Sequence, residues 1–328
     1  MSFSTKDPVS WNDFSGTAPS TATFTGEETF VLQKSDLLAG LPARMAVFGP
    51  DSTRFRLVPA LTLTPGTTTE WLGYNDAPCT AGCGPGISAL GIVAITGTPS
   101  AGNVAWTESD PTFTSTNSPP APRQPSGVAV TTRIDDRFLS AVWQAGNLWL
   151  AGNDACVPAG DSTTRSCLRL LEATTSATPA VVEDFDASAT GTDLYFPAVM
   201  LDSSGDLFVA YSKSSTTMFP TAAAVDGRAA SPATLENEVI LAAGQASYLF
   251  GPNNRWGDYS AAALDPTDPA RIWVTAEYQA SAADPADWGT ATAEVTIIVR
   301  TAITQASPAP PPPRGATNQS APSSPSPR

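Results

Sequence analysis

Two carboxylates and a tyrosine in the C-terminal third have types and a spacing that could support chemistry. Asp258 and Tyr259 belong to the segment RWGDYS, and Glu277 follows a turn rich in Asp and Pro. If Leu264 pairs with Arg271 in an antiparallel hairpin, Asp258 lies opposite Glu277 and Tyr259 points to the other face. A shift of one residue in this register would reverse the faces.

Two carboxylates that face each other across a hairpin are unfavourable unless something neutralises them. Arg255 precedes Asp258 by three residues and could form an ion pair with it, which is the explanation we favour. Two alternatives remain open. One carboxyl could have a raised pKa, or a cation such as Ca²⁺ could bind through oxygen ligands.

A second charged segment precedes a predicted strand that begins near residue 140. It contains Arg133, Asp135 and Arg137. Guanidinium groups match carboxylates in a bidentate geometry, so these residues and Arg255 are candidate ligand-binding residues. The alternative is a turn that holds a local ion pair.

The four cysteines form two close pairs. Cys79 and Cys83 enclose three residues, and Cys156 and Cys167 enclose ten. We predict two local disulfides and no bound metal, because zinc sites favour a closer cysteine spacing and the sequence has no histidine. No cofactor is predicted, apart from the Ca²⁺ alternative. Paired cysteines favour an oxidising compartment, so we expect a secreted or surface-displayed protein.

Composition excludes several classes of function. The chain has 328 residues, with 17 Lys+Arg against 31 Asp+Glu, a net charge of -14 and no histidine. The missing histidine excludes a Ser-His-Asp triad and a haem on an axial histidine. The acidity argues against nucleic acid as a partner, and the apolar runs are too short to span a bilayer. With 24 Gly and 31 Pro, the protein should contain little helix.

The elements that would position these residues are short strands in repeated units. An apolar or aromatic strand that ends in a polar or acidic residue recurs near positions 13, 76, 154, 212 and 277. Hairpin turns are expected at 144–147, 202–205 and 265–269, and outer strands at 167–172, 180–185 and 293–301. This pattern predicts an all-β fold, a β-propeller of about five four-stranded blades over residues 1–306. Trp71, Trp149 and Trp273 recur at one strand position and should lie in the blade cores.

The segment RWGDYS, the Asp265-Pro266 turn and the Trp273…Glu277-Tyr278 stretch resemble bacterial secreted proteins with a sialidase-like (BNR-repeat-like) propeller. The resemblance covers roughly residues 8–303. Sialidases use a tyrosine nucleophile, a glutamate that activates it, an aspartate acid and three arginines that hold the substrate carboxylate. The resemblance therefore implies catalytic roles for Tyr259, Glu277 and Asp258 or Asp135, and a carboxylate clamp of Arg133, Arg137 and Arg255.

One departure weakens the catalytic expectation. The stretch closest to a sialidase Asp box, residues 201–208, has one residue too many between its aspartate and its glycine. The leading hypothesis is therefore a secreted binding propeller for a glycan or an extracellular protein. A retaining glycoside hydrolase of sialidase type and a structural domain of a larger surface protein are the alternatives. We expect a monomer, an incomplete N-terminus, and a disordered Pro/Ser-rich tail at 307–328.

Overall fold

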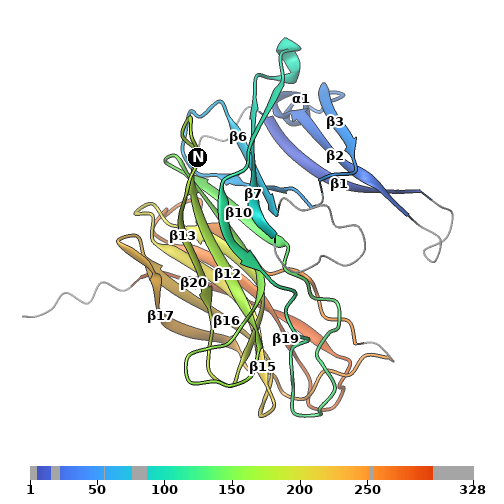
Figure 1. Ribbon diagram of the computed structural model, residues 1–328, viewed down its shortest axis with the longest axis vertical. Coiled ribbons are helices and arrows are strands. Elements are labelled where there is room, and N and C mark those ends of the chain that lie inside the picture. Colours follow the sequence, from blue (N-terminus) through green and yellow to red (C-terminus); the bar gives the residue numbers. More distant parts are fainter. Residues whose placement is uncertain (1–5, 16–22, 55, 76–86, 252–253, 298–328) are drawn as a thin grey trace, which may run out of the picture. The chain divides into compact units, whose positions relative to one another are not determined.

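The structure is a computed structural model that describes residues 6–15, 23–54, 56–75, 87–251 and 254–297 (Figure 1). Cys79, Cys83 and the tail at 307–328 lie outside these residues, so their predicted disulfide and disorder stay predictions. The described residues form an all-β fold, as predicted, with one short α-helix. Few charged side chains and many Thr, Val and Ala residues favour strands over helices in this protein.

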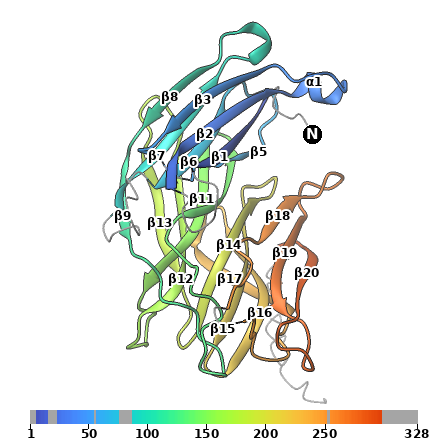
Figure 2. The same cartoon turned by 90° about the vertical axis from the view of Figure 1, so that its right-hand side faces the viewer.

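The first two sheets are built from the N-terminal residues, drawn in blue to teal (Figure 2). The first sheet has the order β1-β2-β3 and the second the order β4-β6-β7-β8, with β9 also paired to β7. The helix α1 follows β2, and the 3-10 helix η1 precedes β8. The elements are β1 (Lys6–Ser15), β2 (Thr23–Gln33), α1 (Lys34–Leu38), β3 (Met45–Asp51), β4 (Val58–Pro59), β6 (Glu70–Asn75), β7 (Ile87–Thr96), η1 (Pro99–Ala101), β8 (Ala105–Ser109) and β9 (Thr112–Thr116).

The third, fourth and fifth sheets are antiparallel meanders in sequence order, and the short β5 (Leu61–Thr62) adds a parallel edge to the third. The third sheet contains β10 (Phe138–Gln144), β11 (Asn147–Cys156), β12 (Arg165–Thr174) and β13 (Val181–Ala187). The fourth contains β14 (Asp193–Leu201), β15 (Leu207–Ser215), β16 (Met218–Arg228) and β17 (Ser231–Ala242). The fifth contains β18 (Ala261–Leu264), β19 (Ile272–Gln279) and β20 (Trp288–Val295).

The predicted hairpin turns are confirmed at 144–147, 202–205 and 265–269, where each links the first two strands of a sheet. Ala145 and Gly146 both have positive φ, as two-residue hairpin turns require. The third and fourth sheets each contain the expected four strands in meander order. Closure of the sheets into a propeller ring is not established by these strands, so the propeller stays a hypothesis.

The largest hydrophobic cluster lies between the third and fourth sheets. It contains Val142, Leu168, Leu194, Phe208 and other fully buried side chains. One predicted disulfide is confirmed here, because Cys156 of β11 and Cys167 of β12 are joined, with their Cα atoms 5.9 Å apart. No helix among the described residues is long and apolar enough to cross a membrane.

The predicted register of the β18–β19 hairpin was wrong by one residue. Leu264 pairs with Ile272, not with Arg271, and Ala263 pairs with Trp273. The error lies in the turn, because the Asp265 N–H donates to the Arg271 carbonyl at 2.9 Å and so includes Arg271 in the turn. Asp258, Tyr259 and Glu277 consequently lose the facing pattern that the sequence suggested, and the paired part of β18 begins only at Ala261.

The tryptophans do not share one environment. Trp149 is buried, as predicted, and Trp71 stacks on Trp143 with ring centroids 6.4 Å apart. Trp273, however, is 41% exposed and donates its indole N–H to Asp265 at 2.7 Å, so its prediction as a core residue was wrong. The alternating burial of β20 shows that one face of this sheet is exposed.

Candidate functional site

A cavity of about 360 Å³ is lined by six charged side chains, and we call it the arginine cavity. The six are Arg56, Arg133, Asp135, Arg137, Arg255 and Asp258. Four guanidinium groups therefore face two carboxylates in a protein whose net charge is -14. This cationic concentration makes the cavity the leading candidate for a binding site, because guanidinium groups bind oxyanions with directed hydrogen bonds.

The residues of the arginine cavity come from segments that lead into different sheets. Arg56 lies between β3 and β4, and residues 133–137 lie directly before β10. Phe196 belongs to β14, and Arg255 and Asp258 precede β18. Loops held by a rigid sheet scaffold are common locations for ligand-binding residues.

Buried polar contacts fix the wall of the cavity. The Asn153 side chain is almost fully buried, donates to the Asp135 carbonyl at 3.1 Å and accepts the Phe196 N–H at 2.8 Å. The Ser260 hydroxyl donates to the Phe196 carbonyl at 2.7 Å. Both backbone groups of Phe196 are thus bound across sheets, which holds this residue in place.

Two lining residues have a backbone conformation that non-glycine residues rarely adopt. Arg56 has φ 60° and Phe196 has φ 55°. Such conformations cost energy and persist where the surrounding contacts enforce them, often at functional sites. At Phe196 the conformation accompanies an irregularity in the pairing of β14 with β15, between Tyr195 and Ala198.

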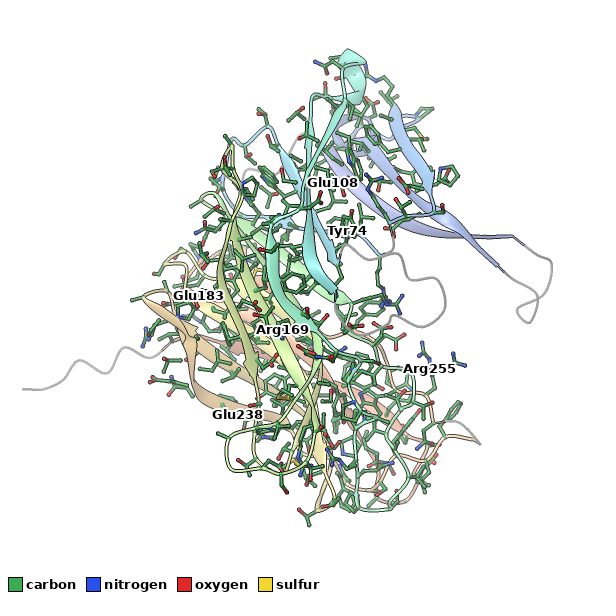
Figure 3. All side chains as sticks on the ribbon, in the orientation of Figure 1. Tyr74, Glu108, Arg169, Glu183, Glu238 and Arg255 are labelled. Carbon is green, nitrogen blue, oxygen red and sulfur yellow. A yellow bond between two sulfur atoms is a disulfide. The ribbon has the colours of Figure 1, made fainter. Side chains whose placement is uncertain are left out.

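The ion pairs of the cavity leave positive charge in excess. Asp135 pairs with Arg137, and Asp258 pairs with Arg255 (labelled in Figure 3). Neither Arg56 nor Arg133 forms an ion pair with an acidic side chain of the described residues. Two guanidinium groups are therefore available to an anionic ligand.

The Asp135 carboxyl remains an acceptor at neutral pH. Burial acts to raise its pKa, but the hydrogen bond and charge of Arg137, together with the charge of Arg56, lower the pKa overall. An ionised Asp135 can accept hydrogen bonds from hydroxyl groups of a ligand.

An aromatic cluster packs next to the cavity. Phe196 contacts Tyr195 edge to face, with ring centroids 5.8 Å apart. Trp256 packs against Tyr248 in the same geometry at 4.9 Å, and both rings belong to the hydrophobic cluster that contains Phe196. The segment RWGDYS thus has a structural tryptophan between Arg255 and Asp258, which both line the cavity.

Tyr259 and Glu277 do not line the cavity, although the sialidase resemblance gave them catalytic roles. Tyr259 is 60% exposed, and its hydroxyl oxygen accepts a hydrogen bond from Arg56 at 2.5 Å. The Arg56 guanidinium carbon also lies 5.5 Å from the centre of the Tyr259 ring, a cation–π contact. The partner of Tyr259 is thus an arginine and not the glutamate that a sialidase nucleophile would need.

Glu277 is a buried acid beside the cavity. Burial raises its pKa to about 7, the charge of Asp258 acts in the same direction, and a hydrogen bond from the Gly257 N–H opposes them. A Cβ at position 257 would stand 2.1 Å from a Glu277 carboxylate oxygen, so this contact requires glycine. Two of the explanations raised for the charged pair therefore apply together, an ion pair at Asp258 and a raised pKa at Glu277.

Five predicted residues meet in one cavity, namely Arg133, Asp135, Arg137, Arg255 and Asp258. Sequence reasoning missed Arg56, which follows Arg54 in a basic pair that could have drawn attention in such an acidic sequence. Within the described residues, no group of three or more Asp, Glu, Cys or His side chains is arranged to hold a metal ion.

No protein-family model matches the sequence, and neither does any curated protein. Three solved structures show a distant likeness at 12% sequence identity. One is described as "Glycoside hydrolase" (TM-score 0.40, 93% of this protein and 88% of the other). Another is described as a complex of BT0996 and RGII (TM-score 0.38, 91% and 86%). The third is a protein of unknown function from Dyadobacter fermentans DSM 18053 (TM-score 0.37, 81% and 79%). At this level of similarity neither fold nor activity transfers to this protein.

Proposed function

We propose that the protein is a binding module that holds the carboxylate of an acidic glycan in the arginine cavity. The observation that carries the proposal is the pair of guanidinium groups, Arg56 and Arg133, that have no acidic partner in the described structure although they line a cavity with two further arginines. A carboxylate placed between them would gain charge-assisted hydrogen bonds and offset the excess positive charge.

Other lining residues favour a sugar over a simple anion. Asp135 and Asp258 supply acceptors for hydroxyl groups, and Phe196 and Leu139 supply apolar contact. A volume of about 360 Å³ is in the range of small-molecule sites and suits one or two sugar rings. A ligand that carries both a carboxylate and hydroxyl groups meets all of these features, as a uronic or sialic acid residue does.

We also propose that the sheets are blades of a propeller and that the protein is secreted or surface-displayed. The meander order of the third and fourth sheets supports the blade assignment. So does the contribution of segments from several sheets to one cavity, as the end of a propeller channel would require. The Cys156–Cys167 disulfide supports an oxidising compartment.

Calorimetric titration with matched sugars tests the binding proposal. We expect galacturonate or a sialoside to bind, and galactose or the asialo sugar to bind at least tenfold more weakly. Arg133→Ala should weaken binding of the acidic sugar by about 10- to 100-fold, the loss expected for a hydrogen bond to a charged group. Arg271→Ala is the matched control, because Arg271 is an exposed arginine that pairs with Asp268 and Glu294 in the fifth sheet and does not line this cavity.

Either of two results would refute the binding proposal. The neutral sugar could bind as tightly as the acidic one, or Arg133→Ala could bind like the wild-type protein. Binding of acidic peptides with equal affinity in a parallel titration would keep the anion site and reject the glycan.

One observation favours a second candidate, hydrolysis of a glycoside. Glu277 has a pKa of about 7 beside Asp258, and a buried acid with such a pKa can donate and accept protons near neutral pH. A panel of fluorogenic glycosides, sialosides included, tests this at pH 5 and pH 7. Turnover that is abolished in Glu277→Gln would replace the binding module with an enzyme, whereas lack of turnover in folded protein would leave the binding proposal.

A further inference from the structure

A second cavity of about 310 Å³ lies between the third and fourth sheets, and we call it the carboxylate cavity. Asp186 of β13 and Glu238 of β17 line it, together with apolar side chains that include Leu168, Phe185, Leu194 and Leu235. Several of these apolar residues belong to the main hydrophobic cluster or pack against it. The cavity thus combines an apolar floor with two carboxylates from different sheets.

Glu238 is a fixed anion. Its two oxygens accept hydrogen bonds from the Tyr211 hydroxyl at 2.5 Å and from the Lys213 ammonium at 2.6 Å. Burial acts to raise the pKa of Glu238, but the hydrogen bonds from Lys213 and Tyr211 outweigh burial and lower it. Glu238 and Lys213 form one balanced ion pair at this side of the cavity.

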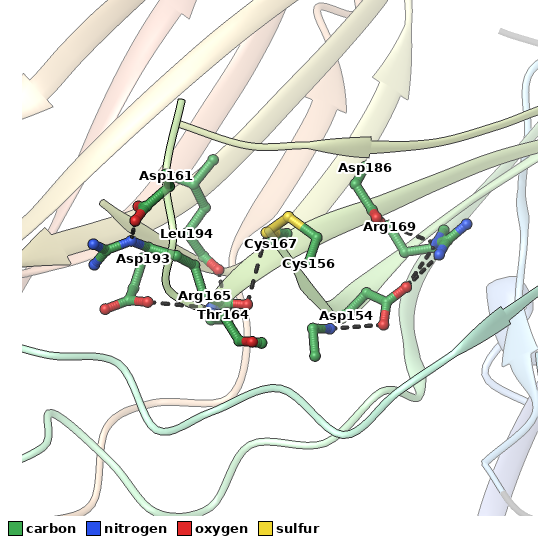
Figure 4. The surroundings of a disulfide bond; sticks show 12 residues. Asp154, Cys156, Asp161, Thr164, Arg165, Cys167, Arg169, Asp186, Asp193 and Leu194 are labelled. Atoms are coloured by element: carbon green, nitrogen blue, oxygen red, sulfur yellow. Dashed lines mark hydrogen bonds and ion pairs between the residues drawn. A yellow bond between two sulfur atoms is a disulfide. The ribbon is translucent and has the colours of Figure 1, made fainter. Parts of the chain in front are cut away.

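Asp186 belongs to an unbalanced cluster. Arg169, which is almost fully buried, pairs with Asp154, Asp184 and Asp186, so three carboxylates share one guanidinium group (Figure 4). Asp154 also accepts the Asn117 N–H at 2.7 Å, and Asp184 also accepts the Thr114 N–H at 2.6 Å. These two carboxylates therefore have backbone partners in addition to Arg169.

Asp186 is the least satisfied of the three. Its Oδ1 is buried and lies 3.1 Å from Arg169 Nε without forming a hydrogen bond, and its Oδ2 has no hydrogen-bond partner among the residues that the structure describes. The side chain is 26% exposed and lines the carboxylate cavity, whereas Asp184 does not line it. An unsatisfied carboxylate above an apolar floor calls for a ligand with a positive, hydrogen-bond-donating group.

We propose that the carboxylate cavity binds an organic ammonium ion, a primary amine on a short apolar stem. The ammonium group would donate to Asp186 Oδ2 and reduce the excess negative charge around Arg169, and the stem would cover Phe185, Leu194 and Leu235. This site uses other residues than the arginine cavity and goes beyond the proposed function. A neutral polyol fits less well, because the floor offers it no hydrogen bonds and it leaves the charge uncompensated.

The binding should depend on pH through Asp186. Burial raises its pKa to about 6, the charge of Arg169 opposes this, and the charges of Asp154 and Asp184 add to it. Glu238 faces the same cavity from β17 but is balanced by Lys213. An amine with a pKa of about 10, like that of a lysine side chain, stays charged at neutral and mildly acidic pH. Its affinity should therefore rise between about pH 5 and pH 8 as Asp186 ionises.

Calorimetric or NMR titration with n-butylammonium and with n-butanol tests the proposal, since the two share their stem and differ in charge. We expect the ammonium ion to bind at least tenfold more tightly than the alcohol at pH 8. Asp186→Asn should lower its affinity at least tenfold, and Asp184→Asn should change it by less than about threefold. Asp184 is the matched control because it pairs with the same Arg169 outside the cavity.

The proposal is overturned if the alcohol binds as tightly as the ammonium ion, or if Asp186→Asn retains the affinity of the wild-type protein. Should Asp186→Asn unfold, the pH series on wild-type protein decides instead. Affinity that is constant from pH 5 to pH 8 then rejects the site, and affinity that increases with pH supports it. Galacturonate should not compete with the ammonium ion, so failure here and failure of the arginine cavity are separable.

Discussion

The two cavities differ in the sign of their charge and in how they are built. In the arginine cavity, segments that precede strands bring guanidinium groups together, and the excess charge is positive. In the carboxylate cavity, side chains within β13, β15 and β17 form the site, and the excess is negative. Each cavity contains one ion pair that balances itself and a further charged group whose partners fall short. This incomplete compensation marks both as candidate ligand sites.

The comparison also separates two effects of burial. Arg169 and Asp154 are nearly inaccessible to water, so their ion pair depends on complete neutralisation inside the protein. Arg255 is 52% exposed, so water screens its pair with Asp258. Removal of a charge should therefore disturb stability at the carboxylate cavity and ligand affinity at the arginine cavity.

The largest effect should follow from Arg169→Met. The substitution leaves three carboxylates without their shared guanidinium group, and a buried charge without its partner costs about 3–5 kcal/mol of stability. Urea unfolding at pH 7 measures the loss, and the loss should shrink at pH 5 as the carboxyls take up protons. Arg271→Ala, which removes an exposed arginine, should cost less than about 1 kcal/mol. Equal losses in the two variants would erase the distinction between buried and screened charge.

The next effect should come from the disulfide, which lies beside the same cluster (Figure 4). The bond links residues separated by 11 positions, and closure of such a loop restricts the unfolded state and stabilises the fold by about 2–3 kcal/mol. Cys156→Ser with Cys167→Ser should lower the unfolding free energy by this amount. Because Cys167 pairs with Asp154 across β11 and β12, amine binding should weaken more than binding of the acidic sugar. A double variant as stable as the wild-type protein would contradict the prediction.

The sequence allowed the hairpins to be predicted because turn chemistry is local. Asp, Gly and Pro at 202–205 and 265–269 specify where a strand must reverse, and the strands follow from it. The register of β18 and β19 could not be obtained in this way. It depends on one hydrogen bond, from the Asp265 N–H to the Arg271 carbonyl, that lengthens the turn by a residue on one side.

The two cavities differed in how far the sequence revealed them. Arg133, Asp135 and Arg137 stand close together, so their clustering was visible, and Arg255 and Asp258 attracted attention as neighbours. Asp186 and Glu238 lie on the outer strands of different sheets, and no local pattern indicates that two such strands border one cavity. Contacts between sheets are decided by packing of the whole core, which a strand pattern does not encode.

Glu277 offers a test of burial beside the arginine cavity. An acid whose pKa rises from 4.5 to about 7 on folding binds its proton more tightly in the folded state. Its contribution to stability is therefore full below the unfolded pKa and is lost as pH rises through 7. Glu277→Gln mimics the protonated acid, so it should match the wild-type protein near pH 4.5 and exceed its stability by about 1–3 kcal/mol at about pH 8. Urea unfolding across this range measures the difference, with Glu294→Gln as an exposed control. A difference that does not change with pH would show that Glu277 is ionised throughout.

The smallest effect should come from Tyr259→Phe, and its size discriminates between the binding and catalytic hypotheses. The hydroxyl makes one exposed hydrogen bond with Arg56, so its loss should change stability by less than about 0.5 kcal/mol. The phenyl ring preserves the contact with the guanidinium group, and Arg56 becomes freer to bind an anion, so affinity for the acidic sugar should stay within about threefold of the wild-type value. Tyr259→Ala removes that contact as well and serves as the comparison in the same titration. If instead the protein turned over a sialoside and Tyr259→Phe abolished the reaction, the hydroxyl would be a nucleophile, and the arginine cavity would be the substrate subsite of an enzyme.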